Sequence, residues 1–203
     1  GALYYDAIMD DARLTLETIL QAEMFGAHVY NYVEVKDIYK AENKISHLVV
    51  EDKQLKKQFV IKGKFYINTT GPNTDRFLKK FDQNHESVLR PSKGVHILLS
   101  NKLTDVPILS ETSDKRRFFI IPWGNQTMVG TTDTEYSNDE NSLSITEEDK
   151  DYLLKEAALH FPEMTISSAD ICSAFVGIRP LVKSKNKSSS NLSSVSRRDK
   201  IIR

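Results

Sequence analysis

The chain has 203 residues, of which 39% are hydrophobic and 28% are charged, so it can bury a core. Its 28 basic and 28 acidic side chains give a formal net charge of +0, which argues against a dedicated binder of nucleic acid or of a membrane surface. Cys172 is the only cysteine, which excludes an intrachain disulfide and a cysteine zinc site, and no metal site is predicted.

The first residues predict a short strand at 3–5 and then a helix. Asp10 is a favourable N-cap, Asp11 complements the positive end of the helix dipole, and Gly26 supplies a left-handed stop. Apolar residues recur at helical spacing and mark the face that we expect to be buried. They are Ala12, Leu16, Ile19 and Leu20.

Three strands are predicted next, at residues 28–39, 44–50 and 58–67, with the charged segment 51–57 as a hairpin turn. Residues 66–72 read Y-I-N-T-T-G-P, and a helix is predicted at 73–81. A strand that leads into a helix through such a turn can present backbone N–H groups to a ligand. It can equally be a plain connection between two elements.

A β-hairpin is predicted in the middle of the chain. Its strands are residues 118–121 and 127–129, and the turn between them is W-G-N-Q. Pro122 belongs at a strand end or a bulge, because it cannot donate to a central ladder. The second strand runs into Gly130-Thr131-Thr132-Asp133, where small residues admit a close neighbour and polar groups offer hydrogen bonds to it. The alternative is a buried hairpin with a polar exit loop.

Two residues beside predicted strands are candidates for chemistry. His96 precedes a strand at 97–99 and can act as a base or be structural. Arg179 follows a strand at 171–178 and stands before Pro180, so its backbone is constrained. A guanidinium held in this way suits a phosphate or a carboxylate, and the alternative is a structural salt bridge.

The remaining segments predict one helix and two loops. Thr146 caps a helix at 146–160, which Pro162 ends, and its apolar stripe is expected in the core. Residues 138–141 and the Ser/Lys/Asn-rich segment 183–197 are predicted loops.

Taken together and in this order, six stretches resemble the family of FAD-dependent glycerol-3-phosphate dehydrogenases and oxidases along nearly the whole chain. They are Y-Y-D-A-I-M-D-D-A-R-L (residues 4–14), I-N-T-T-G-P (67–72), K-G-V-H-I (93–97), I-P-W (121–123), V-G-T-T-D-T-E-Y (129–136) and G-I-R-P-L (177–181). The sequence departs from the family at Asn73, where a Trp is usual.

The resemblance implies an α+β chain that is part of a larger α/β flavoprotein. It implies a substrate domain with a mixed, largely antiparallel sheet packed with helices, and part of an FAD-binding domain of the D-amino-acid-oxidase-like type. Residues 1–25 would lead out of the substrate domain, 26–80 would belong to the FAD-binding domain, and 81–203 would bind substrate. The glycine-rich loop of the family is expected before Gly1, so we expect this chain alone to bind FAD poorly.

The resemblance also assigns site residues. His96 would be the base, and Arg179 would be both catalytic and substrate-binding, with Arg198 as a second substrate contact. Thr132 and Asp133 would shape the pocket or support the flavin. The residues expected to contact FAD are Val33, Val35, Thr70, Gly71 and Thr132.

The implied reaction is oxidation of sn-glycerol 3-phosphate to dihydroxyacetone phosphate, with hydride transfer to FAD and electrons passed to a quinone. An oxidase that uses oxygen, an amino-acid or glycine oxidase, and a binding module without a redox role are the alternatives. The amino-acid oxidase fits the motifs less well. Family members are peripheral to a respiratory membrane, which is the mitochondrial inner membrane or the bacterial plasma membrane. No nucleic-acid partner is expected.

Overall fold

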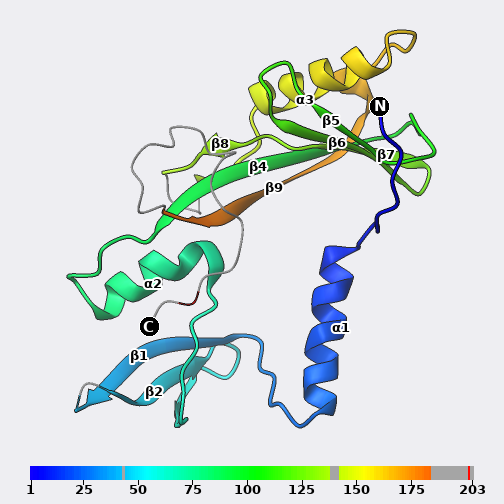
Figure 1. The fold of residues 1–203 in the computed structure, drawn as a ribbon. Helices are drawn as coiled ribbons and strands as arrows, with labels where there is room; N and C mark the ends of the chain where they lie inside the picture. The colour runs from blue at the N-terminus through cyan, green and yellow to red at the C-terminus, as the bar shows by residue number, and fades with distance from the viewer. Residues whose placement is uncertain (43, 138–141, 184–200, 202–203) are drawn as a thin grey trace. The chain divides into compact units, whose positions relative to one another are not determined.

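The computed structural model describes residues 1–42, 44–137, 142–183 and 201. The chain divides into two compact units, Gly1–Ile67 and Asn68–Arg203, which we describe separately (Figure 1). The predicted loop at 138–141, the loop at 183–197 apart from Lys183, and Arg198 lie outside the described residues. The division at residue 67 does not test the assignment of ranges to an FAD-binding and a substrate domain, which stays a prediction.

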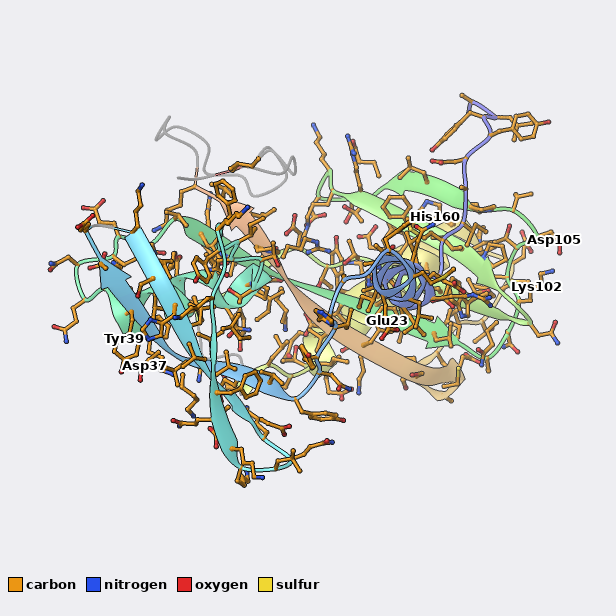
Figure 2. The ribbon with its side chains drawn as sticks, turned by 90° about the horizontal axis from the view of Figure 1, so that it is seen from below. Glu23, Asp37, Tyr39, Lys102, Asp105 and His160 are labelled. Carbon is orange, nitrogen blue, oxygen red and sulfur yellow. The ribbon has the colours of Figure 1, made fainter. Side chains whose placement is uncertain are left out.

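The first unit contains α1 (Asp11–Met24) and an antiparallel sheet in the order β1 (Val33–Ala41), β2 (Lys44–Asp52) and β3 (Lys57–Ile61). The helix limits confirm the sequence prediction, since the Asp10 carboxylate accepts from the N–H of Arg13 at 3.0 Å and Gly26 has φ +91°. In the sheet, Figure 2 shows Asp37 and Tyr39 projecting from β1.

Several predictions for the first unit are wrong. Residues 3–5 form no strand and lie exposed. The stripe of α1 is not buried, and Leu16 is 55% exposed, because no other described part of the chain covers it. β1 begins at Val33, since Tyr32 adopts φ +57° and interrupts the extended path. β3 ends at Ile61, and the segment 62–67 leaves the sheet.

The second unit is built on an antiparallel sheet with a helix packed on one face. The path runs through β5 (Ile108–Glu111), β6 (Arg117–Trp123), β7 (Gln126–Gly130), β4 (Leu89–Leu99) and β8 (Thr134–Glu135), and β9 (Ile171–Val182) pairs with β4. Figure 1 shows β4 and β9 running side by side as long strands. The helix on the sheet is α3 (Glu147–His160), and α2 (Thr74–Phe81) follows a 3₁₀ turn at Gly71–Asn73. A second such turn is Ser168–Asp170. This architecture confirms the α+β fold class.

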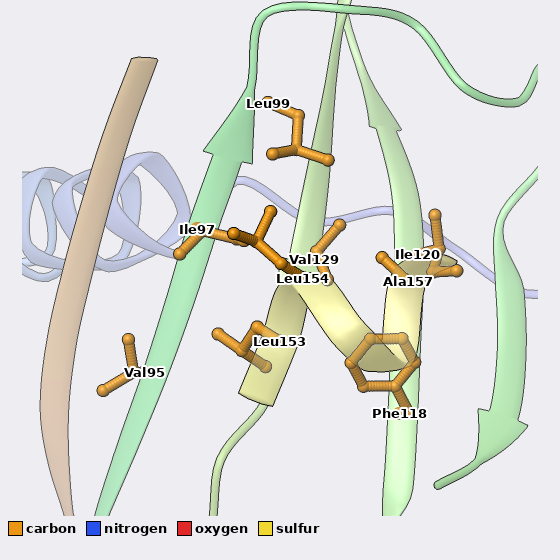
Figure 3. Packing of buried hydrophobic residues seen from close by; sticks show 9 residues of the cluster. All are labelled: Val95, Ile97, Leu99, Phe118, Ile120, Val129, Leu153, Leu154 and Ala157. Atoms are coloured by element: carbon orange, nitrogen blue, oxygen red, sulfur yellow. The ribbon is translucent and has the colours of Figure 1, made fainter. Parts of the chain in front are cut away.

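The core of the second unit lies between α3 and the sheet. Figure 3 shows side chains of β4, β6 and β7 meeting those of α3. The buried apolar residues of this cluster are Val95, Ile97, Leu99, Phe118, Ile120, Val129, Leu153, Leu154 and Ala157. The cap of α3 is as predicted, since the Thr146 hydroxyl accepts from the N–H of Asp149 and the Asp149 side chain accepts from the N–H of Thr146.

The central hairpin is confirmed, with Trp123 opposite Gln126 and Gly124 in the turn at φ +62°. Pro122 lies one residue from the end of β6, as expected. The predicted limits of two strands are wrong. β4 begins at Leu89 and not at 97, and β9 continues to Val182, because the two strands pair with each other from Leu89 to Leu99. His96 and Arg179 therefore lie within strands and not beside them.

The loop that follows β4 is held by two contacts, one within the loop and one to the sheet. Lys102 and Asp105 form an exposed ion pair of 2.7 Å at its rim, and Figure 2 labels both side chains. The loop is anchored to the sheet by the N–H of Leu103, which donates to the Thr127 hydroxyl at 2.8 Å.

Candidate functional site

Within the second unit, α3 packs on one face of the sheet, and its described residues pack no helix on the other face beside His96. Side chains alternate along a strand, so Val95 and Ile97 point into the core while Ser92, Gly94 and His96 point to the other face. The register places Arg179 opposite Ser92, Gly177 opposite Gly94, and Phe175 opposite His96. We call the face that carries these six residues the open face.

The guanidinium of Arg179 crosses β4 on the open face and binds the segment that follows β7. Its Nη2 donates to the Thr131 hydroxyl at 2.7 Å, and its Nη1 donates to the main-chain carbonyl of Thr132 at 3.2 Å. The same Nη1 lies 3.5 Å from a carboxylate oxygen of Asp133. This arrangement holds a cation in a fixed orientation on the open face.

Asp133 is tied to the sheet as well as to Arg179. Its carboxylate accepts a short hydrogen bond from the Ser92 hydroxyl, and its main-chain carbonyl accepts from Nη1 of Arg116 at 3.1 Å. Arg116 in turn pairs with Asp114 through its Nε at 2.7 Å. The hydrogen bonds from Arg116, and further ones from Thr112 and Tyr152, hold the pKa of Asp114 well below its ordinary value against the opposing effect of burial.

His96 lies on the same face, two residues along β4 from Gly94. Its ring stacks on Phe175 of β9, with centroids 5.1 Å apart and planes 10° apart. A Cβ added at Gly130 would overlap the His96 ring, which shows that the imidazole lies directly over the backbone of β7. The two candidate catalytic residues therefore share one face. The guanidinium of Arg179 lies over Gly94, two residues from His96 on β4. Residues two apart on a strand are separated by roughly 7 Å, a distance that a small phosphorylated molecule can span.

The residues expected to contact FAD lie in both units. Val33 and Val35 are on β1 of the first unit, while Thr70, Gly71 and Thr132 belong to the second. Thr132 is 3% exposed, and its hydroxyl accepts from the N–H of Val95 at 2.9 Å, so the structure uses it as an anchor to β4. Whether these five residues contact a cofactor stays a prediction.

The turn at Thr70-Gly71 fits the close approach of a large cofactor. Gly71 has φ +57°, and a Cβ built there would meet no described atom within 4 Å. The Thr70 hydroxyl is turned to the Asn68 side chain at 2.7 Å, which orders the turn. Gly71 is half-buried, and its backbone has no side chain that would shield it.

A groove of about 880 Å³ lies elsewhere in the second unit, between α2, the start of β4, β8 and the end of β9. Neither His96 nor Arg179 lines it. Its cations are Arg76, Lys79, Arg90 and Lys183, and its carboxylates are Asp75 and Glu135. Arg90 and Glu135 pair at 2.9 Å, and the four hydrogen bonds of Asp75 are to His85, Ser87, Val88 and Leu89. Arg90, Glu135 and Asp75 thus serve structural contacts, and neither candidate catalytic residue lines the groove, so we place the candidate site on the open face.

Sequence reasoning named Thr132 and Asp133 near the site, but it missed Ser92, Gly94, Phe175 and Arg116. The spacing offered a signal, because residues two apart on a strand point to the same face. Ser92, Gly94 and His96 have this spacing on one strand, and Phe175, Gly177 and Arg179 have it on another. Arg116 carried no such signal, because its contact with Asp133 depends on the turn between β5 and β6.

Among the described residues, no cluster of His, Cys, Asp and Glu is arranged to hold a metal ion. Within the same ranges, every helix is too short or too polar to cross a membrane.

A family model and several curated relatives match most of this chain. Residues 1–195 match the family model described as FAD dependent oxidoreductase. The chain is 34% identical over 203 residues to the aerobic glycerol-3-phosphate dehydrogenase of Bacillus subtilis (strain 168), an alignment that covers 99% of this chain and 36% of the relative. It is 36% identical over 198 residues to the alpha-glycerophosphate oxidase of Enterococcus casseliflavus, covering 94% of this chain and 32% of the relative. The chain thus spans about a third of the length of these relatives.

Two solved structures superpose on most of this chain. The glycerol-3-phosphate dehydrogenase from Bacillus halodurans, solved in complex with FAD, superposes with a TM-score of 0.79 at 36% identity, over 86% of this chain and 36% of that one. The L-proline dehydrogenase from P. horikoshii superposes with a TM-score of 0.63 at 16% identity, over 87% of this chain and 44% of that one. The second likeness concerns the fold alone.

Proposed function

Since the chain belongs to the family of FAD-dependent oxidoreductases, we propose that it forms the substrate side of a flavoprotein that oxidises sn-glycerol 3-phosphate to dihydroxyacetone phosphate. The observation that carries this proposal is that a fixed guanidinium, Arg179, and an imidazole, His96, lie on the same open face of the sheet. The names of the relatives and the FAD complex of the Bacillus halodurans protein support the substrate and the cofactor.

The proposed chemistry divides between the two residues. Arg179 binds the phosphate dianion through a charge-assisted contact and so orients the molecule along the strand. His96 accepts the proton of the C2 hydroxyl, and the C–O bond becomes a carbonyl as the C2 hydrogen leaves with its electron pair. When bound, FAD supplies the acceptor of that hydride. Val33, Val35, Thr70, Gly71 and Thr132 are the residues that we propose would hold it, and Arg198 is proposed as a second contact to the phosphate.

For the fate of the electrons we propose a quinone acceptor, as in a dehydrogenase. Oxygen is the second candidate, because several relatives at similar identity are named alpha-glycerophosphate oxidase. We further propose a peripheral position at a respiratory membrane. The relatives named above are bacterial, which favours the plasma membrane over the mitochondrial inner membrane for this chain.

The test is anaerobic titration of the flavin-loaded holoenzyme, and not of this chain alone, with sn-glycerol 3-phosphate, followed by flavin absorbance. We expect bleaching by this substrate and none by glycerol at the same concentration, because glycerol lacks the phosphate that Arg179 binds. Binding without bleaching would favour the non-catalytic module, and the absence of both would refute the proposal. Readmission of oxygen then separates the acceptors, since an oxidase produces hydrogen peroxide and a dehydrogenase needs an added quinone.

A variant pair connects the reaction to Arg179. Arg179→Ala removes a charge-assisted contact. It should reduce the transition-state stabilisation calculated from kcat/KM by roughly 1.5–3 kcal/mol. Lys155→Ala, at an exposed position of α3 on the opposite face of the sheet, removes a positive charge away from the open face and should leave the reaction unchanged.

A further inference from the structure

Gly94 occupies an unusual place for a glycine. It lies within the long strand β4 and faces Gly177 directly across the pairing with β9, so the two strands share no side-chain contact at this point. Glycine inside a strand weakens it, and such a position often marks the close approach of another group. The φ of Gly94 lies outside the left-handed region, so its backbone does not require glycine.

An alanine at position 94 would place its Cβ in space that another side chain already occupies. A Cβ built at Gly94 would lie 2.5 Å from both Cζ and Nη1 of Arg179, and closer still to Nη2. Real Cβ atoms do not come so near to other heavy atoms. The guanidinium therefore occupies the volume that a side chain of residue 94 would fill.

That volume is the passage by which Arg179 reaches its partners. Arg179 starts from β9, on one side of β4, while Thr131 and Thr132 follow β7 on the other side. Its Nη groups arrive at the Thr131 hydroxyl and the Thr132 carbonyl, at 2.7 and 3.2 Å, only by crossing the strand over Gly94.

Gly177 provides an internal contrast. It lies on the same face, directly opposite Gly94, and it also has an ordinary φ. A Cβ built there would meet no atom of the described chain within 4 Å. An alanine at 177 therefore displaces nothing in the described chain, whereas an alanine at 94 must displace the guanidinium, although the two positions are neighbours.

We propose that Gly94 is a positioning residue for Arg179: the missing side chain lets the guanidinium cross β4 and dock on Thr131 and Thr132 in the orientation that receives the phosphate of the substrate. The effect on substrate rests on the proposed function. The dependence of the Arg179 position on Gly94 does not.

The first arm of the test measures stability and needs no substrate. Thermal unfolding is compared for the wild type, Gly94→Ala, Arg179→Ala and the double variant. Because Gly94→Ala expels the guanidinium and breaks its hydrogen bonds, we expect it to lower Tm in the wild type and to leave Tm nearly unchanged when Arg179 is already alanine. If Gly94→Ala does not fold at all, the double variant should restore folding. Equal shifts in both backgrounds, or no rescue, would overturn the proposal.

The second arm measures the reaction in the flavin-loaded protein. Gly94→Ala should raise the KM for sn-glycerol 3-phosphate roughly tenfold or more, and it should add nothing when combined with Arg179→Ala. Gly177→Ala is the matched control for the stability arm and should not lower Tm, because its added Cβ meets no described atom. A wild-type KM in Gly94→Ala would refute the positioning role. If the wild type itself does not react, the proposed function fails, and the stability arm still decides the role of Gly94.

Discussion

The guanidinium of Arg116 donates to the main-chain carbonyl of Asp133 across 3.1 Å, and so ties the turn between β5 and β6 to the segment that holds Arg179. Arg116 is fixed in turn by Asp114 and lies over the ring of Tyr152, 4.8 Å from its centroid. Two arginines thus donate hydrogen bonds to the segment 131–133 from different elements. Arg179 reaches it from β9 on the open face, and Arg116 reaches it from the turn between β5 and β6.

This relationship predicts the effect of Arg116→Met in the flavin-loaded protein. Loss of the hydrogen bond should loosen the acceptors of Arg179, so we expect KM for sn-glycerol 3-phosphate to rise several-fold while kcat changes less. Lys155→Met, at an exposed position of α3 on the opposite face of the sheet, is the control. Steady-state kinetics measures both. A fall in kcat without a change in KM would contradict this indirect role.

The buried ion pair of Lys93 and Asp149 predicts a large effect on stability. Lys93 Nζ lies 2.6 Å from the Asp149 carboxylate, and the two residues are 9% and 7% exposed. Removing one partner leaves a buried charge unpaired, so Lys93→Met should lower the free energy of unfolding by about 3–5 kcal/mol. Lys150→Met breaks the exposed pair with Glu147 and should change it by less than about 1 kcal/mol. Urea unfolding measures both, and similar losses would contradict the assignment.

Asp75 predicts a pH dependence of stability. Burial raises the pKa of Asp75, but hydrogen bonds from Ser87, His85 and the N–H groups of Val88 and Leu89 outweigh it and hold the pKa far below its ordinary value. The unfolded chain therefore binds the proton first as pH falls. The stabilisation is fully present above about pH 5 and is lost as pH decreases toward the folded pKa.

The corresponding variant is Asp75→Asn. It should destabilise the protein by about 1–3 kcal/mol at pH 7 and flatten the decline of unfolding free energy between about pH 5 and pH 2. Chemical unfolding at a series of pH values measures this slope. Asp82→Asn, in the exposed turn after α2, is the control and should change the free energy of unfolding at pH 7 by less than about 1 kcal/mol. An unaltered slope in Asp75→Asn would count against the depressed pKa.

Two leucines of α3 predict opposite outcomes for one substitution. Leu153 is 0% exposed within the core, whereas Leu159 on the same helix is 61% exposed. Leu153→Ala should lower the free energy of unfolding by about 2–5 kcal/mol, because it leaves a cavity, and Leu159→Ala should stay within about 0.5 kcal/mol. Equal effects in denaturant unfolding would show that α3 does not pack as described.

The sequence predicted those elements that local interactions define. The cap of α1 at Asp10, the capping box of α3 at Thr146 and the turn at Gly124 each depend on residues within four positions of one another. Predictions failed where distant pairing decides the outcome. A strand was predicted through residue 67, but the sheet ends at Ile61, and the strand predicted at 97–99 begins at Leu89 because of the long pairing with β9.

By itself, the sequence determined the family, through six short motifs in a specific order, and it named His96 and Arg179 as candidates. Only the tertiary structure decided that they share a face, that Arg179 passes over Gly94, and that Arg116 reaches Asp133. The physical reason is register. Residues 94 and 179 come together because two strands separated by more than seventy residues pair in one alignment, and a shift of one position would turn Arg179 to the opposite face.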